Sequence, residues 1–179
     1  MQRQNQSSGY SLYELLVTLT IAATILGLGL PSFASLMADK RLRVESNALF
    51  HAVHRARQES IVRRRVVTIC PSRDSLYCDA EGDWSKGWII FANIGRTGLN
   101  IRTDAESLIR HHQVGEMARI QANRATFSFR STHLRATNGT LIVCDRSGRS
   151  ESRAVVISYT GRPRVARKDR RGKAYECVD

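Results

Sequence analysis

The sequence lacks the motifs by which common enzyme classes are recognised. It contains neither a glycine-rich phosphate loop nor a nucleophile elbow. Its five histidines show no metal-ligand spacing. His51 and His54 lie three residues apart, but a zinc ion there would need further ligands that the sequence does not place. We therefore expect a protein that is not an enzyme, with no catalytic residue, no metal and no cofactor.

Acidic residues are scarce relative to basic ones. The 179 residues include 28 lysines and arginines but 16 aspartates and glutamates, which gives a formal net charge of +12 and an isoelectric point of about 10.4. This charge favours a polyanionic partner, either nucleic acid or an anionic lipid or polysaccharide surface. The length suits one domain plus a long helix.

Charged side chains are absent from one long stretch, residues 15–38. As a helix this stretch would be about 36 Å long, enough to cross a hydrocarbon core of about 30 Å. We therefore expect a transmembrane segment over residues 15–36, within a helix over residues 10–64. Glu14 lies at the start of the run, where a carboxylate is costly without a partner, so it is a functional candidate. The alternative is that Glu14 merely sits at the membrane interface.

Cysteines are few, and their number is even: Cys70, Cys78, Cys144 and Cys177. If this part of the chain is exported, an even number indicates disulfides. Four cysteines allow three pairings, of which we expect Cys70–Cys78 and Cys144–Cys177. The alternative is a structural zinc site, but the spacings lack the close cysteine pairs that zinc favours.

Short β-branched and aromatic runs follow the helix and predict strands. Turn signals separate these runs, and Asn138-Gly139 among them predicts a hairpin. The expected fold class is therefore α+β, with the long helix packed on a small β-sandwich or β-sheet domain over residues 65–179. The expected strands are residues 66–70, 88–91, 108–111, 126–129, 140–144 and 154–159.

The N-terminal residues have a distinctive order. Gly9 comes before the apolar run, the aromatic Tyr10 follows it, and Glu14 comes four residues later. This order resembles the class III signal of type IV prepilins and pseudopilins. The resemblance implies that residues 1–9 are a leader, which prepilin peptidase removes by cutting after Gly9, and that the new N-terminal residue Tyr10 is N-methylated. It also implies that Glu14 pairs with the new amino group at Tyr10 of a neighbouring pilin subunit. The helix would anchor the chain in the inner membrane before assembly and pack in the filament afterwards.

Cysteine and tryptophan positions extend this resemblance into the rest of the chain. The segment 70–78 begins and ends with cysteine, and Trp84 and Trp88 follow within the segment 83–91. This pattern is similar to minor pilins of the FimT/FimU group and to the related H-type minor pseudopilins of type II secretion. We expect both tryptophans to pack in the core or under loops rather than to form a ligand cage.

The C-terminal segment 161–173 carries half of the net charge, with seven basic residues and one acid. Gly161 frees the backbone to leave the last strand, and Pro163 blocks strand continuation and stiffens an extended loop. Arg162 and Arg164 would project from this loop, where their planar forks suit bidentate phosphate contacts. The basic residues of the segment are Arg162, Arg164, Arg167, Lys168, Arg170, Arg171 and Lys173.

The run Gly161-Arg162-Pro163-Arg164 resembles the C-terminal Gly-Arg-x-Arg motif of FimT-type pilins that bind DNA in natural transformation. The resemblance implies a minor type IV pilin that binds DNA without sequence specificity and supports DNA uptake. Its domain would lie in the periplasm and later on the cell-surface pilus. Two alternatives stay open. One is a purely structural minor pilin or pseudopilin with a solvated basic tail. The other is an adhesin that uses the same charges on lipid or polysaccharide.

Overall fold

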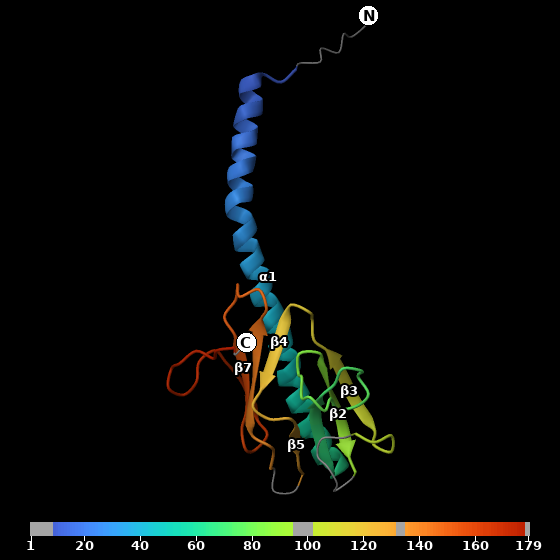
Figure 1. The fold of residues 1–179 in the computed structure, drawn as a ribbon. Helices are drawn as coiled ribbons and strands as arrows, with labels where there is room; N and C mark the ends of the chain where they lie inside the picture. The colour runs from blue at the N-terminus through green and yellow to red at the C-terminus, as the bar shows by residue number, and fades with distance from the viewer. Residues whose placement is uncertain (1–8, 95–101, 132–134, 178–179) are drawn as a thin grey trace, which may run out of the picture. The chain divides into compact units, whose positions relative to one another are not determined.

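The computed structural model describes residues 9–94, 102–131 and 135–177 (Figure 1). The chain divides into two compact units, one ending at Met37 and the other beginning at Ala38. The helix α1 (Leu12–Arg63) contributes residues to both units. All strands of the described residues belong to the second unit.

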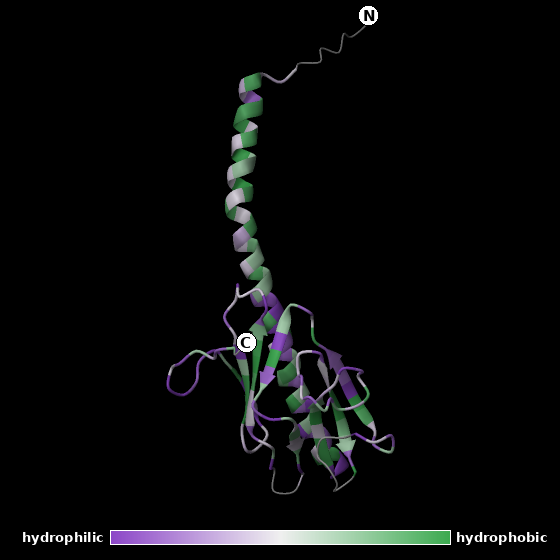
Figure 2. Ribbon diagram, viewed as in Figure 1, coloured by the Kyte–Doolittle hydropathy of each residue, from purple (hydrophilic) through white to green (hydrophobic). Residues whose placement is uncertain are grey.

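The N-terminal part of α1 is apolar and exposed. Its large side chains from Leu12 to Met37 are exposed to solvent, and Figure 2 shows the hydrophobic colouring of this stretch. By length and composition, α1 could cross a membrane. Pro31 lies inside the helix without ending it. A helix that is apolar on all sides is stable only when lipid or other apolar helices cover it.

The first turn of α1 is capped by its own side chains. The Glu14 amide donates a hydrogen bond to Ser11 Oγ at 3.2 Å, and the Ser11 amide donates one to Glu14 Oε2 at 3.1 Å. This reciprocal pair is a capping box, which satisfies amides that have no carbonyl partner at a helix start. Within a single chain, Glu14 therefore caps its own helix.

The C-terminal part of α1 packs into the core of the second unit. Its buried positions recur at spacings of three and four residues, as expected for an amphipathic helix. The same core includes residues of both sheets, together with Trp84 and Trp88. Each tryptophan is 2% exposed, which confirms their expected packing role. The buried residues of this part of α1 are Ala38, Leu42, Glu45, Ser46, Leu49, Ala52, Val53, Ala56 and Ser60.

The helix ends in a left-handed residue. Arg64 has a φ of 52°, and the Arg65 amide donates a hydrogen bond to the Ser60 carbonyl at 3.3 Å. The Arg64 amide bonds back to the Ile61 carbonyl at 3.3 Å. These two bonds form a Schellman-type cap. The arginines at this end also suit the negative pole of the helix dipole.

The described residues of the second unit also form two four-stranded sheets, in which all neighbouring strands run antiparallel. The first sheet, in the order β3-β2-β1-β5, comprises β1 (Val66–Pro71), β2 (Gly87–Asn93), β3 (Leu108–Gln113) and β5 (Phe127–Phe129). The second sheet, in the order β4-β6-β7-β8, comprises β4 (Ala118–Ala122), β6 (Gly139–Asp145), β7 (Arg153–Ile157) and β8 (Pro163–Ala166). The α+β class is therefore confirmed.

Three local predictions differ from the structure. The strand β4 was not predicted, because its sequence Ala-Arg-Ile-Gln-Ala has no β-branched run, and its pairing with β6 makes it a strand. The hairpin predicted at Asn138-Gly139 is wrong, since β5 and β6 belong to different sheets. The loop predicted over residues 161–173 is wrong for its first part, because Pro163 begins β8. This strand forms an edge of the sheet, where proline is tolerated at the first position.

Candidate nucleic-acid interface

Gly161 shapes the turn that joins β7 to β8. It has a φ of 73°, and its amide donates a hydrogen bond to the Ser158 carbonyl at 2.9 Å. A Cβ atom at this position would lie 3.1 Å from Phe129 Cδ1 and 3.1 Å from Ala136 Cβ. Both the left-handed backbone and the close packing therefore require glycine. We expected Gly161 to let the chain leave the last strand. In the structure it lies in the turn where the chain reverses direction between β7 and β8.

The strand β8 places Arg164 on the outer face of the second sheet. Arg164 pairs with Val156 of β7, which in turn pairs with Thr140 of β6. The adjacent residue Val155 is fully buried in the core. Because successive side chains of a strand point to opposite faces, Arg164 lies on the face away from the core, next to Val156 and in line with Thr140.

A tight turn after β8 presents two more arginines. The carboxylate of Asp169 accepts hydrogen bonds from the amides of Arg171 and Lys173, at 2.8 and 2.9 Å. The Gly172 amide donates to the Asp169 carbonyl at 3.2 Å, and Gly172 has a φ of 83°. Asp169, the one acid of the segment, therefore stabilises the turn that carries Arg170 and Arg171.

These elements enclose an open groove of about 620 Å³ on the outer face of the second sheet. Its cationic residues come from the β7–β8 turn, from β8 and from the Asp169 turn. Tyr159 and Tyr175 line it as well; neither was predicted as a site residue, although both flank the basic segment. We call this feature the arginine groove, and its arginines are Arg162, Arg164, Arg170 and Arg171.

Three of the predicted basic residues do not line the arginine groove. Arg167 Nη2 lies 3.8 Å from Asp39 Oδ1, and Lys173 Nζ lies 3.4 Å from Glu176 Oε1. Lys168 is exposed and forms an isolated backbone bridge with Ala174. The structure therefore brings together four of the seven predicted basic residues.

A disulfide fixes the C-terminal end of the segment to the second sheet. Cys144 of β6 is bonded to Cys177, with their Cα atoms 6.1 Å apart. The hydroxyl of Ser152 also donates a hydrogen bond to the carbonyl of Tyr175. These links reduce the freedom of the segment between β8 and Cys177, so its arginines lose less entropy when they bind a ligand.

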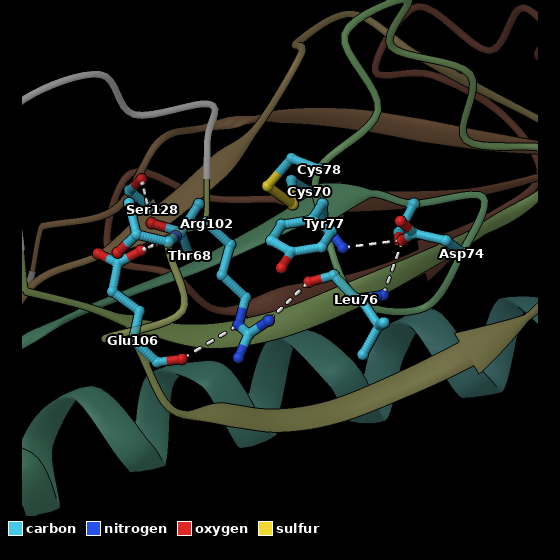
Figure 3. Close-up of a disulfide and its surroundings, with 11 residues drawn as sticks. Thr68, Cys70, Asp74, Leu76, Tyr77, Cys78, Arg102, Glu106 and Ser128 are labelled. Carbon is cyan, nitrogen blue, oxygen red and sulfur yellow. Dashed lines mark hydrogen bonds between the residues drawn. A yellow bond between two sulfur atoms is a disulfide. The ribbon is translucent and has the colours of Figure 1, made fainter.

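The other disulfide closes a loop on the first sheet. Cys70 is bonded to Cys78, and the Asp74 carboxylate accepts hydrogen bonds from the amides of Leu76 and Tyr77, both at 2.8 Å (Figure 3). These bonds lower the pKa of Asp74. Both expected cysteine pairs are therefore present. None of these residues lines the arginine groove, so we assign this disulfide to the stability of its loop.

Asp39 of α1 holds the second sheet to the helix. Its Oδ1 lies 2.7 Å from Arg153 Nη2 of β7, and its Oδ2 lies 2.8 Å from Arg43 Nε. Hydrogen bonds from Arg153, and then from Arg43, lower the pKa of Asp39 from 3.8 to about 2. The ionised form of Asp39 therefore favours the folded state.

We expect replacement of Asp39 by asparagine to lower the free energy of unfolding by about 1–2 kcal/mol near neutral pH, because it leaves the charge of Arg153 unpaired. The contribution of Asp39 is fully present above pH 3.8 and is lost as the pH falls toward about 2. Urea unfolding of both proteins at several pH values, followed by tryptophan fluorescence, checks this. A difference between the two proteins that does not shrink in acid would contradict this role for Asp39.

Among the described residues, no group of three or more histidine, cysteine, aspartate or glutamate side chains is placed to hold a metal ion. The cysteines that could bind zinc are joined in disulfides. What the arrangement offers chemically is a set of exposed guanidinium groups on a backbone that turns and a disulfide hold in place.

Comparisons with known proteins agree with this fold. Residues 45–161, more than half of the chain, match the family model described as type II transport protein GspH. The type IV minor pilin FimU of Pseudomonas aeruginosa is 18% identical, with a TM-score of 0.54, over 72% of this chain and 90% of that chain. The minor pseudopilin EpsH from the type 2 secretion system of Vibrio cholerae is 10% identical, with a TM-score of 0.51, over 70% of this chain and 96% of that chain.

No curated protein matches the sequence significantly. The family match nevertheless covers both sheets up to the β7–β8 turn, and the solved structures share the fold. The chain therefore belongs to the GspH family, and it has the fold of the minor pilin FimU and of the minor pseudopilin EpsH.

Proposed function

We propose that this chain acts as a minor type IV pilin and binds DNA by the phosphate backbone, in the arginine groove. The observation that supports the proposal is the convergence of Arg162, Arg164, Arg170 and Arg171 on one open hollow. The carboxylate of Asp169 is hydrogen-bonded to amides of its own turn, and it forms no ion pair with these four arginines in the described part of the chain. The groove therefore carries a concentrated positive charge on a fixed backbone.

The chemistry of the groove suits a nucleic-acid strand. Each guanidinium can donate two parallel hydrogen bonds to phosphate oxygens. Tyr159 and Tyr175 add aromatic rings beside the arginines, on which unpaired bases can stack. Backbone contacts and stacking do not read base edges, so binding is independent of sequence. Such binding would support the uptake of DNA in natural transformation.

The proposal extends to processing and assembly. Prepilin peptidase cuts between Gly9 and Tyr10, and residues 15–36 hold the chain in the inner membrane, with residues 65–179 in the periplasm. The exposed apolar side chains of α1 support this anchoring. In the assembled pilus, Glu14 pairs with the amino group of Tyr10 in a neighbouring subunit, which offsets the cost of burying its carboxylate.

A mobility-shift experiment with the full chain in a nonionic detergent tests DNA binding. We expect duplexes of equal length and unrelated sequence to bind with equal affinity at low salt, because the contacts are to the backbone. The absence of a shift at low salt would favour a purely structural subunit. A sulfated polysaccharide and unlabelled DNA can each be added to displace the bound duplex. If the polysaccharide does so at a lower molar concentration of negative charge than the DNA, the adhesin is favoured.

A further inference from the structure

A second basic hollow lies between α1 and the edge strand β3, away from the arginine groove. In the register of the first sheet, Trp88 of β2 pairs with His112, and Ile90 pairs with Arg110. Trp88 and Ile90 belong to the core that includes α1, so His112 and Arg110 share the face that is turned toward the helix. The hollow has a volume of about 340 Å³, and its lining residues are Ala48, His51, Ala52, Arg55, Trp88, Arg110 and His112.

The hollow continues along the helix. A neighbouring space of about 540 Å³ shares His51, Arg55 and Arg110 with it and is also lined by Phe50, His54 and Gln58. The ring of Phe50 packs edge-on against His54, with ring centroids 4.8 Å apart. His112 stacks on Trp88, with ring centroids 4.9 Å apart. Aromatic contacts therefore hold two of the histidine rings in fixed positions.

The acids nearest to this hollow are already engaged. Glu45 Oε2 lies 2.8 Å from His112 Nε2, and Glu45 Oε1 accepts a hydrogen bond from the Gly115 amide at 3.1 Å. Glu59 is shared between Arg55, at 3.2 Å, and Arg63, at 2.7 Å. No acid of the described residues lines the hollow itself.

Arg110 has no acidic partner. It is exposed, and it forms no ion pair or side-chain hydrogen bond within the described part of the chain. By contrast, the exposed Arg43 and Arg73 each bind a carboxylate nearby. Arg110 and Arg55 line the same hollow, so an anion bound there would be attracted to both cations.

We propose that this hollow is a binding site for a phosphate-bearing ligand of nucleotide size. Arg55 and Arg110 reach it from the helix and from the strand, so two guanidinium forks can hold one phosphate group from different directions. His51 supplies a further ring nitrogen, while Trp88 and Ala52 provide an apolar floor. A space of this size exceeds a phosphate ion and lies in the range of small-ligand pockets, about 300–1,000 Å³.

This site is independent of the proposed DNA-binding function. No residue that lines the α1–β3 hollow also lines the arginine groove. A variant of one site should therefore keep ligand binding at the other. The phosphate could come from a free ion, from a mononucleotide or from a nucleotide unit of a strand. Comparing the affinities for inorganic phosphate, dAMP and oligodeoxythymidylate, which represent these sources in that order, separates them.

Calorimetric titration of the full chain in a nonionic detergent tests the proposal, with tryptophan fluorescence as a second readout because Trp88 lies at the floor. We expect saturable binding of dAMP, weakened about tenfold or more when Arg55 and Arg110 are both replaced by glutamine. The matched control replaces Arg41 and Arg149 by glutamine. Both are exposed and lie outside the hollow, so this variant should bind dAMP like the wild type.

The outcomes are distinct. Stronger binding of dAMP than of inorganic phosphate supports a nucleotide-sized ligand, and equal affinity identifies the phosphate group alone as the ligand. Binding of dAMP that persists in the Arg162→Gln/Arg164→Gln variant separates this site from the arginine groove. The proposal is overturned if neither phosphate nor dAMP binds, or if the Arg55→Gln/Arg110→Gln variant binds both as tightly as the control.

Discussion

A chain in which Arg162 and Arg164 are both replaced by glutamine is expected to bind duplex DNA about tenfold to a hundredfold more weakly than the wild type. A hydrogen bond to a charged group contributes about 1.5–3 kcal/mol, and exposure to solvent reduces that figure. Both side chains are exposed and line the arginine groove, so the fold should be unaffected. Fluorescence anisotropy with a labelled duplex at fixed salt measures the loss, and circular dichroism checks the fold.

The matched control removes two arginines from the end of α1. Arg63 and Arg65 are exposed and lie outside the arginine groove. Their replacement by glutamine lowers the net charge by the same amount, so a general effect of charge would appear equally in both variants. If the helix-end variant loses DNA binding while the groove variant keeps it, the site has been placed on the wrong part of the domain. If neither variant loses affinity, the purely structural role is favoured.

Replacement of Gly9 by valine is expected to leave the chain uncut. The proposed peptidase acts at the bond between Gly9 and Tyr10, which lies before the start of α1, where both residues are exposed. A β-branched side chain restricts the backbone beside that bond and fills the space that glycine leaves open. Mass spectrometry of the N-terminus should show a wild-type chain that begins with N-methylated Tyr10 and a variant chain that retains residues 1–9.

A glycine within the apolar helix provides the control for processing. Nothing lies within 4 Å of a Cβ atom built at Gly27, so its replacement by alanine should be cut like the wild type. A wild-type chain that begins at any residue other than Tyr10, or an uncut wild-type chain in assembled pili, would contradict the proposed signal.

Local sequence patterns predicted much of the fold. The β-branched and aromatic runs identified β1, β2, β6 and β7. These strands supply much of the buried core, so they are rich in the residue types that strands bury. Leu49, Val53 and Ala56 recur at spacings of three and four residues, which is the pattern of a packed helix face, and all three are buried. The capping box at Ser11 was missed, although Ser and Glu three residues apart are its sequence signal.

The rest depended on contacts between distant segments. Ala118–Ala122 becomes a strand by pairing with β6, which its own residues do not reveal. Pro163 can begin a strand because β8 lies at an edge of the sheet, and the order of strands cannot be deduced from local sequence. Arg170 lines the arginine groove together with Arg164, whereas Arg167 does not. This follows from the turn that the Asp169 carboxylate stabilises.

The dependence of DNA affinity on salt tests the central claim most directly, because each phosphate that the protein neutralises releases counterions. With four groove arginines engaged, the logarithm of affinity should fall against the logarithm of salt concentration with a slope of roughly −3 to −4 on duplex DNA. The Arg162→Gln/Arg164→Gln variant should reduce that slope to about −2. An unchanged slope in this variant, or a wild-type slope near zero, would contradict DNA binding by the arginine groove.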